Sequence, residues 1–152
     1  MIDTGIAMTV SNDLGGTIAR SLKNLRSFPE GTRNCYTLRP EQGKNNNYLV
    51  RATFWYGNYD GKNITPSFDL HLGPNRWDTV KPANPVYYEF IYSPKTDYID
   101  LCLVNTGLGV PFISTLELRH LDNSIYQTTE GQALFLTNRY DVGRRKTESR
   151  IR

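Results

Sequence analysis

The sequence predicts an all-β protein, an antiparallel β-sandwich or jelly roll. Short segments in which apolar and polar residues alternate recur about every 10 to 20 residues, which is typical of such folds. Turn residues separate these segments, since the 152-residue chain has 12 Gly and 8 Pro. Ten Tyr, six Phe and two Trp favour strands, and no stretch has the length and period of a long amphipathic helix. The size indicates a single domain.

The alternation is clearest over residues 48–56, which we expect to form a strand. One face of this strand is apolar throughout and should point into the core; it comprises Tyr48, Val50, Ala52, Phe54 and Tyr56. Glycines and the Asp60-Gly61 pair predict a turn directly after it. Before it, residues 1–26 predict one short strand with a loop or helical turn, and Cys35–Leu38 predicts another short strand.

Further strands are expected after this turn, each with one apolar face and a polar outer face. They are Ser67–Leu72, Val86–Tyr92, Tyr98–Val104 and Phe112–Leu121. Gly73 and Pro74 predict a turn that presents Trp77. Leu134–Leu136 predicts at most an isolated short strand before a polar, basic end.

The two cysteines, Cys35 and Cys102, leave two alternatives open. A disulfide between them would close a long loop and stabilise the fold by about 3–5 kcal/mol. As free thiols, each would pack as a small core side chain. Their wide separation lacks the close spacing of a zinc or redox motif, so we expect no metal and no cofactor.

The distribution of charge argues against nucleic acid as a partner. The net charge is +3, but the residues from Arg139 onward carry six basic and two acidic side chains, and the rest of the chain is near −1. A nucleic-acid-binding domain concentrates basic charge on its folded face. The apolar runs are also shorter than the ~18 residues of a membrane span, and the N-terminus lacks the pattern of a signal peptide.

Five separated segments resemble the malectin-like domain in the extracellular part of plant leucine-rich-repeat receptor kinases. They occur in the family's order and cover nearly the whole chain. They are FPEGTRNCYTL (Phe28–Leu38), YLVRATFWYGNYDG (Tyr48–Gly61), PSFDLHLGPNRWDTV (Pro66–Val80), LCLVNTGLGVPFISTLELRHL (Leu101–Leu121) and NRYDVG (Asn138–Gly143).

The resemblance implies a β-sandwich on the extracellular face of the plasma membrane in the parent receptor. Family regions are tandems of two modules and usually begin with an ID-C-G strand, whereas this chain opens at Ile2–Gly5 with IDTG. We therefore expect one module over residues 1–126, without its first strand. Residues 127–152 would be a linker with a basic tail and the incomplete start of a second module.

The resemblance also points to the loop after residues 48–56. Malectin, an animal lectin of the same family, binds a glucose disaccharide through aromatic and acidic residues on such loops. The matching residues here are Trp55, Tyr56, Tyr59 and Asp60, with Asn58 as a further polar group. Rings that stack on a sugar, together with planar hydrogen-bonding groups, suit an oligosaccharide. A structural role in the core and turn is the alternative for every one of these residues.

We therefore expect a non-catalytic recognition module that binds carbohydrate, such as a cell-wall oligosaccharide, through this loop. The alternative is a module that binds a peptide or protein, or spaces other domains, and binds no sugar. An enzyme is not expected. His71 and His120, the only histidines, fall at outward positions of predicted strands, and no nucleophile, phosphate-loop or metal-binding motif occurs. Asn63 begins the only glycosylation sequon, although Pro66 follows it closely.

Overall fold

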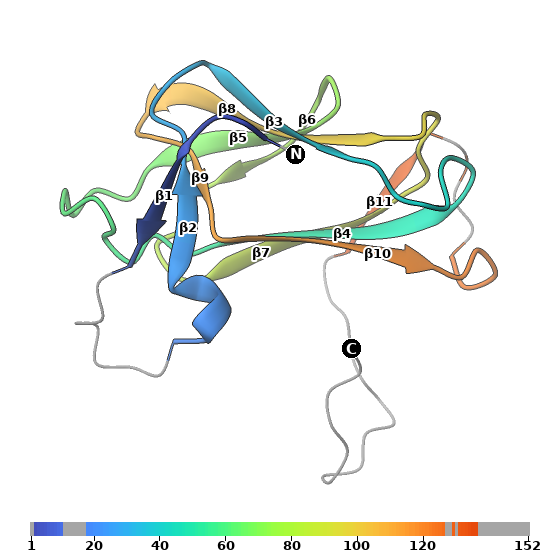
Figure 1. The fold of residues 1–152 in the computed structure, drawn as a ribbon, viewed down its shortest axis with the longest axis horizontal. Helices are drawn as coiled ribbons and strands as arrows, with labels where there is room; N and C mark the ends of the chain where they lie inside the picture. Colours follow the sequence, from blue (N-terminus) through green and yellow to red (C-terminus); the bar gives the residue numbers. More distant parts are fainter. Residues whose placement is uncertain (1, 11–17, 127–128, 130, 137–152) are drawn as a thin grey trace, which may run out of the picture.

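The computed structural model describes residues 2–10, 18–126, 129 and 131–136 (Figure 1). Within these residues the chain forms strands and one 3-10 turn, with no α-helix. The elements are β1 (Ile6–Thr9), η1 (Arg20–Leu22), β2 (Asn24–Ser27), β3 (Arg33–Leu38), β4 (Asn47–Phe54), β5 (Ser67–Leu72), β6 (Asn75–Val80), β7 (Val86–Tyr92), β8 (Ile99–Leu108), β9 (Phe112–Ile113), β10 (Thr115–Leu121) and β11 (Ala133–Phe135).

Two four-stranded sheets face each other as the layers of a sandwich (Figure 1). One sheet has the strand order β3-β8-β5-β6 and the other the order β10-β4-β7-β11. A three-stranded sheet of order β1-β2-β9 stands at one end of the sandwich. The strand pairs of the described residues all run antiparallel. The predicted antiparallel sandwich is therefore confirmed.

Strand β4 lies at the centre of its sheet and supplies much of the core. It pairs with β10 on one side and β7 on the other, so both edges of its backbone are hydrogen-bonded. The predicted inward face is confirmed, because its residues are buried. They are Tyr48, Val50, Ala52, Phe54 and, just beyond the strand, Tyr56.

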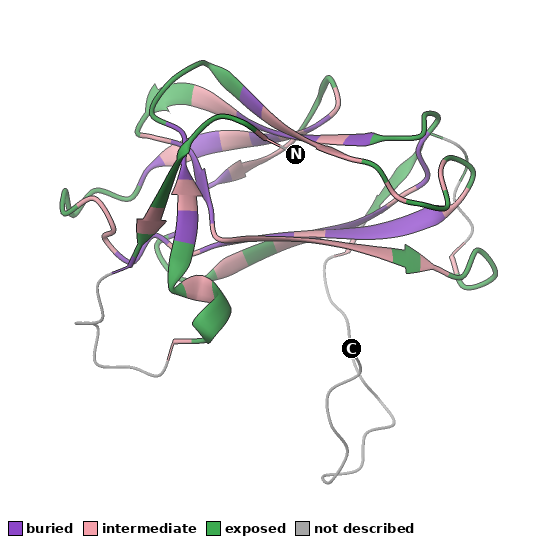
Figure 2. Cartoon of the chain, viewed as in Figure 1, coloured by how far each residue is buried: buried purple, intermediate pink, exposed green. Residues whose placement is uncertain are grey.

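The outer face of the same sheet is less polar than the sequence predicts. Leu49 and Ile91 lie opposite each other on neighbouring strands, facing away from the core. Yet their exposed fractions are only 3% and 1%. Figure 2 accordingly shows purple over much of β4 and over part of β7. Alternation alone cannot reveal such burial, since it depends on what covers the outer face.

Charged side chains beside this apolar pair form a connected set on β4, β7 and β10. Arg51 Nε donates to Glu89 Oε1 at 2.6 Å, and the Glu89 carboxylate is 3% exposed. Glu117 lies 3.7 Å from Arg51 and accepts from Arg119 at 2.6 Å. The Arg51 guanidinium also stacks over the Tyr87 ring at 5.5 Å. Pairing of this kind is what makes a buried carboxylate tolerable.

Several predicted strands match the observed ones closely, whereas the predicted position of Trp77 is wrong. Ser67–Leu72 and Val86–Tyr92 are β5 and β7 with the expected bounds. Trp77, expected at a turn, instead lies within β6, with its ring 4.4 Å from that of Phe90. Strand β6 is polar at most positions and forms a sheet edge, so it lacks the apolar alternation by which the other strands are recognised.

Strand β11 shows that the sheet continues past residue 126. Its residues pair with β7, including Leu134 opposite Ile91. The segment expected to be at most an isolated strand is thus the fourth strand of a sheet. The basic segment that follows it, residues 137–152, lies outside the described residues.

Of the two alternatives for the cysteines, the structure has the disulfide. Cys35 on β3 and Cys102 on β8 are directly opposite each other in the antiparallel register, and their sulfurs are bonded. The bridge links neighbouring strands of one sheet but spans 67 residues of sequence. A loop of this length loses much conformational entropy in the unfolded chain.

Removing the bridge should therefore lower stability substantially. We expect the Cys35→Ala/Cys102→Ala double variant to lose about 4 kcal/mol of unfolding free energy, because the loop is no longer closed in the unfolded state. Urea denaturation of the oxidised chain and the variant measures the difference. A loss below about 1 kcal/mol would contradict this account of the bridge.

Candidate functional site

The loop after β4, predicted to be the site, folds back on itself through two turns. Tyr59 N donates to Tyr56 O at 3.2 Å, and Gly61 N donates to Asn58 O at 3.1 Å. Gly57 adopts a positive φ of 48°. A Cβ atom there would overlap Val10, so the close approach of backbone to core requires glycine at this position.

Tyr56 is buried within this loop and is 6% exposed. Its hydroxyl donates to Asp60 Oδ1 at 2.5 Å, with Asn58 Oδ1 as a second acceptor at 3.2 Å. Burial and then the hydrogen bond to Asp60 raise the pKa of Tyr56 to about 12. The ring and hydroxyl of Tyr56 are thus both engaged inside the protein.

Tyr59 is also held by internal contacts, for which the sequence showed no reason. Its ring packs at 5.3 Å against Phe112 and at 5.6 Å against Tyr56. Its hydroxyl hydrogen-bonds with Ser27 Oγ at 3.1 Å. Burial raises the pKa of Tyr59, while the Ser27 bond acts in the opposite direction. Phe112 and Ser27 are both distant in sequence, so local pattern could not reveal this packing.

The remaining predicted residues complete the loop's own hydrogen bonding. Asn58 Nδ2 donates to Asn63 Oδ1, and Asn63 N donates back to Asn58 Oδ1, both at 2.8 Å. Asp60 Oδ1 also accepts from Lys62 N at 3.2 Å. Trp55 packs against the core, and its buried indole N–H has no hydrogen-bond partner among the residues that the structure describes. The structure brings all five predicted residues together, in a loop whose polar groups largely satisfy one another.

Asn63 itself is exposed and has a positive φ of 56°. Its side-chain oxygen, rather than its nitrogen, makes the bond to Asn58. Glycosylation at Asn63 stays a prediction.

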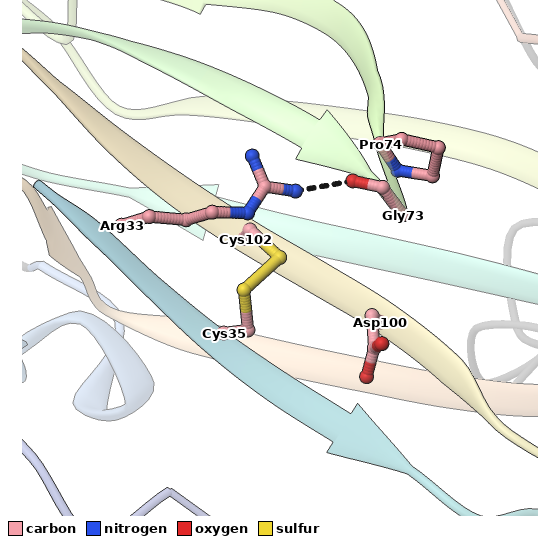
Figure 3. A pocket seen from close by; sticks show the side chains of 6 residues that line it. All are labelled: Arg33, Cys35, Gly73, Pro74, Asp100 and Cys102. Carbon is pink, nitrogen blue, oxygen red and sulfur yellow. Dashed lines mark hydrogen bonds between the residues drawn. A yellow bond between two sulfur atoms is a disulfide. The ribbon is translucent and has the colours of Figure 1, made fainter.

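A second candidate site lies on the outer face of the β3-β8-β5-β6 sheet, where sequence analysis placed none. A hollow of about 460 Å³ opens over the disulfide (Figure 3). It is lined by Arg33, Cys35, Gly73, Pro74, Asp100 and Cys102. Figure 3 shows the Arg33 side chain extended above the bridge towards the turn between β5 and β6.

A smaller hollow of about 200 Å³ adjoins the first at this turn, since both are lined by Gly73, Pro74 and Asp100. It continues to the end of β7 and the connection from β7 to β8, where Tyr92, Lys95 and Tyr98 contribute. We call the two hollows together the bridge groove.

Arg33 is fixed in place at the rim of the bridge groove. Its Nη1 lies 3.3 Å from His71 Nδ1, and its Nη2 donates to Gly73 O. Arginine has only donors, so His71 Nδ1 must be the acceptor, which requires the neutral ring with its hydrogen on Nε2. His71 thus acts as a support for the guanidinium.

The acidic groups of the same face already have partners in the fold. Asp100 Oδ1 accepts from the Thr37 hydroxyl at 2.6 Å. Asp69 accepts from Thr79 at 2.6 Å and pairs with Arg76 at 3.1 Å, and these contacts hold its pKa below the usual range. Among the described residues no carboxylate forms an ion pair with Arg33.

Neither surface has the composition of a metal centre. The described part of the chain holds no cluster of three or more His, Cys, Asp or Glu side chains that could bind a metal ion. Nor does it contain a helix of the length and apolar character that crossing a membrane demands.

Comparison with known proteins assigns the fold to a family. The malectin-like domain family matches residues 1–152. The chain belongs to the malectin-like family. A probable leucine-rich-repeat receptor-like serine/threonine-protein kinase of Arabidopsis thaliana is 53% identical over 146 residues, which are 93% of this chain and 16% of that protein. The malectin-like chain thus spans about one sixth of the length of this relative.

Solved structures of plant proteins share the fold. The ANX2 ectodomain from Arabidopsis thaliana superimposes with a TM-score of 0.66 at 13% identity, over 80% of this chain and 36% of that one. A structure of the plant peptide RALF23 in complex with FER and LLG2 gives a TM-score of 0.62 at 15% identity, over 79% of this chain and 40% of that one. At such identities the likeness extends to the fold alone.

The internal bond of Tyr56 can be tested by titration. Because the folded state raises the pKa of Tyr56 from 10.0 to about 12, it favours the neutral phenol. The resulting stability is complete below pH 10 and is lost as the pH rises towards 12. Ultraviolet titration should show a tyrosinate transition near pH 12 that is absent from Tyr56→Phe. A transition for Tyr56 near its ordinary value would contradict the buried bond.

The close approach of the loop to the core can be tested with alanine. A Cβ at Gly57 would overlap Val10 and lie 2.9 Å from Trp55 Nε1, so Gly57→Ala should cost about 3 kcal/mol of unfolding free energy. Gly61→Ala is the matched control, since Gly61 also has a positive φ but its added Cβ meets no atom within 4 Å. Strain alone predicts about 1 kcal/mol there. If urea denaturation shows that both variants lose the same unfolding free energy, the proposed close contact between Gly57 and the core is contradicted.

Proposed function

We propose that the chain is a non-catalytic recognition module of a plant receptor-like protein and that it binds a peptide or protein. In the parent receptor it lies on the extracellular face of the plasma membrane. One observation carries the choice of ligand class: the Tyr56–Asp60 loop, where a sugar site was expected, uses its aromatic rings and polar groups internally.

A sugar site needs aromatic rings whose faces can stack on the sugar, and planar polar groups that can hydrogen-bond to the sugar hydroxyls. Tyr56 is buried and bonded to Asp60, and the ring of Tyr59 packs edge-on against Phe112. Freeing either ring would break contacts that hold the loop on the sandwich. The carbohydrate function therefore ranks second, with Trp55, Asn58 and Asp60 as the residues left to serve it.

The family supports a recognition role. The relative that matches over most of this chain is a receptor-like kinase, and the ANX2 structure is that of an ectodomain. FER, whose own solved structure shares the fold, was also solved in complex with the peptide RALF23 and with LLG2. We carry over from that complex the class of partner, a peptide or protein. The second malectin-type module expected in the parent chain is a further protein partner of this class.

The histidines support the non-catalytic part of the proposal. His71 Nδ1 is the acceptor for Arg33, and His120 contacts the Tyr48 ring at 5.7 Å and Asn46 Oδ1 at 3.4 Å. Each histidine therefore contacts a neighbouring side chain of the fold. Asp69 and Asp122 lie near enough to His71 and His120, respectively, to interact electrostatically, but neither histidine hydrogen-bonds to a carboxylate or a nucleophile among the described residues.

Parallel screens of the oxidised chain test the proposal. One uses a display library of short peptides and the other an array of plant cell-wall oligosaccharides, with calorimetry of the best binders. We expect peptide binding in the micromolar range or tighter, and no saturable glycan binding. The same measurements on the parent ectodomain serve as a control for the short chain.

Two variants distinguish the ligand classes. Tyr59→Ala removes the ring from the loop, whereas Tyr59→Phe keeps the ring and removes only the bond to Ser27. Peptide binding elsewhere should survive both substitutions. Saturable binding of an oligosaccharide that is lost in Tyr59→Ala and kept in Tyr59→Phe would overturn the proposal in favour of the carbohydrate function.

A further inference from the structure

We infer that the bridge groove binds an acidic segment of a peptide, with Arg33 receiving its carboxylate. The inference rests on the proposed function and names the surface and the ligand chemistry. The larger hollow lies over the disulfide, the smaller one reaches Tyr98 at the end of the sandwich, where residues of both sheets line it, and both hollows are lined by Gly73, Pro74 and Asp100. A short segment of peptide placed over both hollows would cross the lining that they share at Gly73 and Pro74.

Arg33 is prepared to bind an anion. Contacts to His71 and Gly73 hold its guanidinium, and they use two of its five N–H donors. The three that remain include donors on different nitrogens, which permits the paired geometry that a carboxylate favours. Because the side chain is already ordered, binding costs little further conformational entropy.

The other charges of the groove favour the same ligand. Its lining residues include two cations, Arg33 and Lys95, against one carboxylate, Asp100. Asp100 accepts a hydrogen bond from Thr37, whereas no described carboxylate pairs with either cation. By contrast, Arg51, Arg76 and Arg119 each form an ion pair with a carboxylate. An incoming carboxylate would supply the missing anion.

Apolar surface lies beside these cations. It indicates a peptide in which an apolar residue is next to the acidic one in sequence. Pro74 and the disulfide form part of the floor. At the far end Tyr98 is 40% exposed and has Arg39 over its ring at 5.7 Å. Proline or aromatic side chains pack well on such surfaces. An acidic residue next to a proline or aromatic one would therefore contact the whole groove.

The experiment compares two pools of short peptides on the full oxidised chain. In one pool a glutamate is fixed at the centre between aromatic or proline positions, and in the other glutamine replaces it. Fluorescence polarisation should give about 10- to 100-fold tighter binding for the glutamate pool, because a charge-assisted bond to Arg33 is lost with glutamine. Added salt should narrow this difference.

Variants assign the effect to the groove. Arg33→Gln should remove the preference for glutamate, and Arg33→Lys should keep part of it, since lysine retains the charge without the fork. Lys62→Gln is the control, because it removes one positive charge from the loop after β4, at the opposite end of the sandwich from the β7–β8 connection (Figure 1). Near-ultraviolet circular dichroism establishes whether each variant is folded. If Arg33→Gln does not fold, Arg33→Lys still tests whether the preference for glutamate depends on the guanidinium.

The outcomes separate this inference from the proposed function. Equal binding of the two pools, or a preference that survives Arg33→Gln, would overturn the bridge groove as the acidic-peptide site and leave peptide recognition standing. Binding of oligosaccharides with no binding of either pool would overturn both. A glutamate preference that is lost in Arg33→Gln and kept in Lys62→Gln supports the inference.

Discussion

The packing of aromatic rings around Phe112 is the interaction on which the rest of the fold depends. Phe112 lies on the short strand β9 and is fully buried. Its ring contacts Phe54 of one main sheet at 6.3 Å and Phe68 of the other at 5.8 Å. The same ring meets Tyr59 of the loop at 5.3 Å. One side chain therefore joins both layers, the end sheet and the loop, with edge-to-face contacts that add to the free energy of burial.

This arrangement is the physical reason why we rank ligand binding by the loop after β4 second. An aromatic residue at a strand end can either pack into the core or face a ligand. The contacts that hold its ring in the core prevent the same ring from stacking on a ligand. Tyr56 and Tyr59 follow Phe54 directly into the cluster around Phe112, and the turn that brings them there requires Gly57. The polar residues between them then bond one another because the turn holds them within reach. A loop that closes one end of the sandwich need not also bind a ligand.

The alternation of apolar and polar residues predicted most strands, but it did not predict which outward-facing residues are buried by other parts of the chain. Strands β5 and β7 follow from alternation because one face of each meets the core and the other does not. Burial of Leu49 and Ile91 on the outer face depends on residues from other parts of the chain, and the partner of Trp77, Phe90, lies on the opposite sheet. The same limit applies to Tyr59. Its composition suggested a ligand, but its packing depends on residues distant in sequence.

The bridge groove could be approached from sequence only through the disulfide. Arg33, Cys35 and Thr37 share one face of a strand by their spacing of two, as do Asp100 and Cys102. Bonding Cys35 to Cys102 sets the register of the two strands, and an antiparallel register then places Thr37 opposite Asp100 and Arg33 two positions beyond the bridge. If the cysteines are taken as free thiols, the sequence does not determine the register of the two strands, and the residues that line the bridge groove cannot be predicted. The bond that stabilises the sheet also fixes which polar groups meet on its outer face, so the site proposed for the peptide depends on the same pair of residues as the stability.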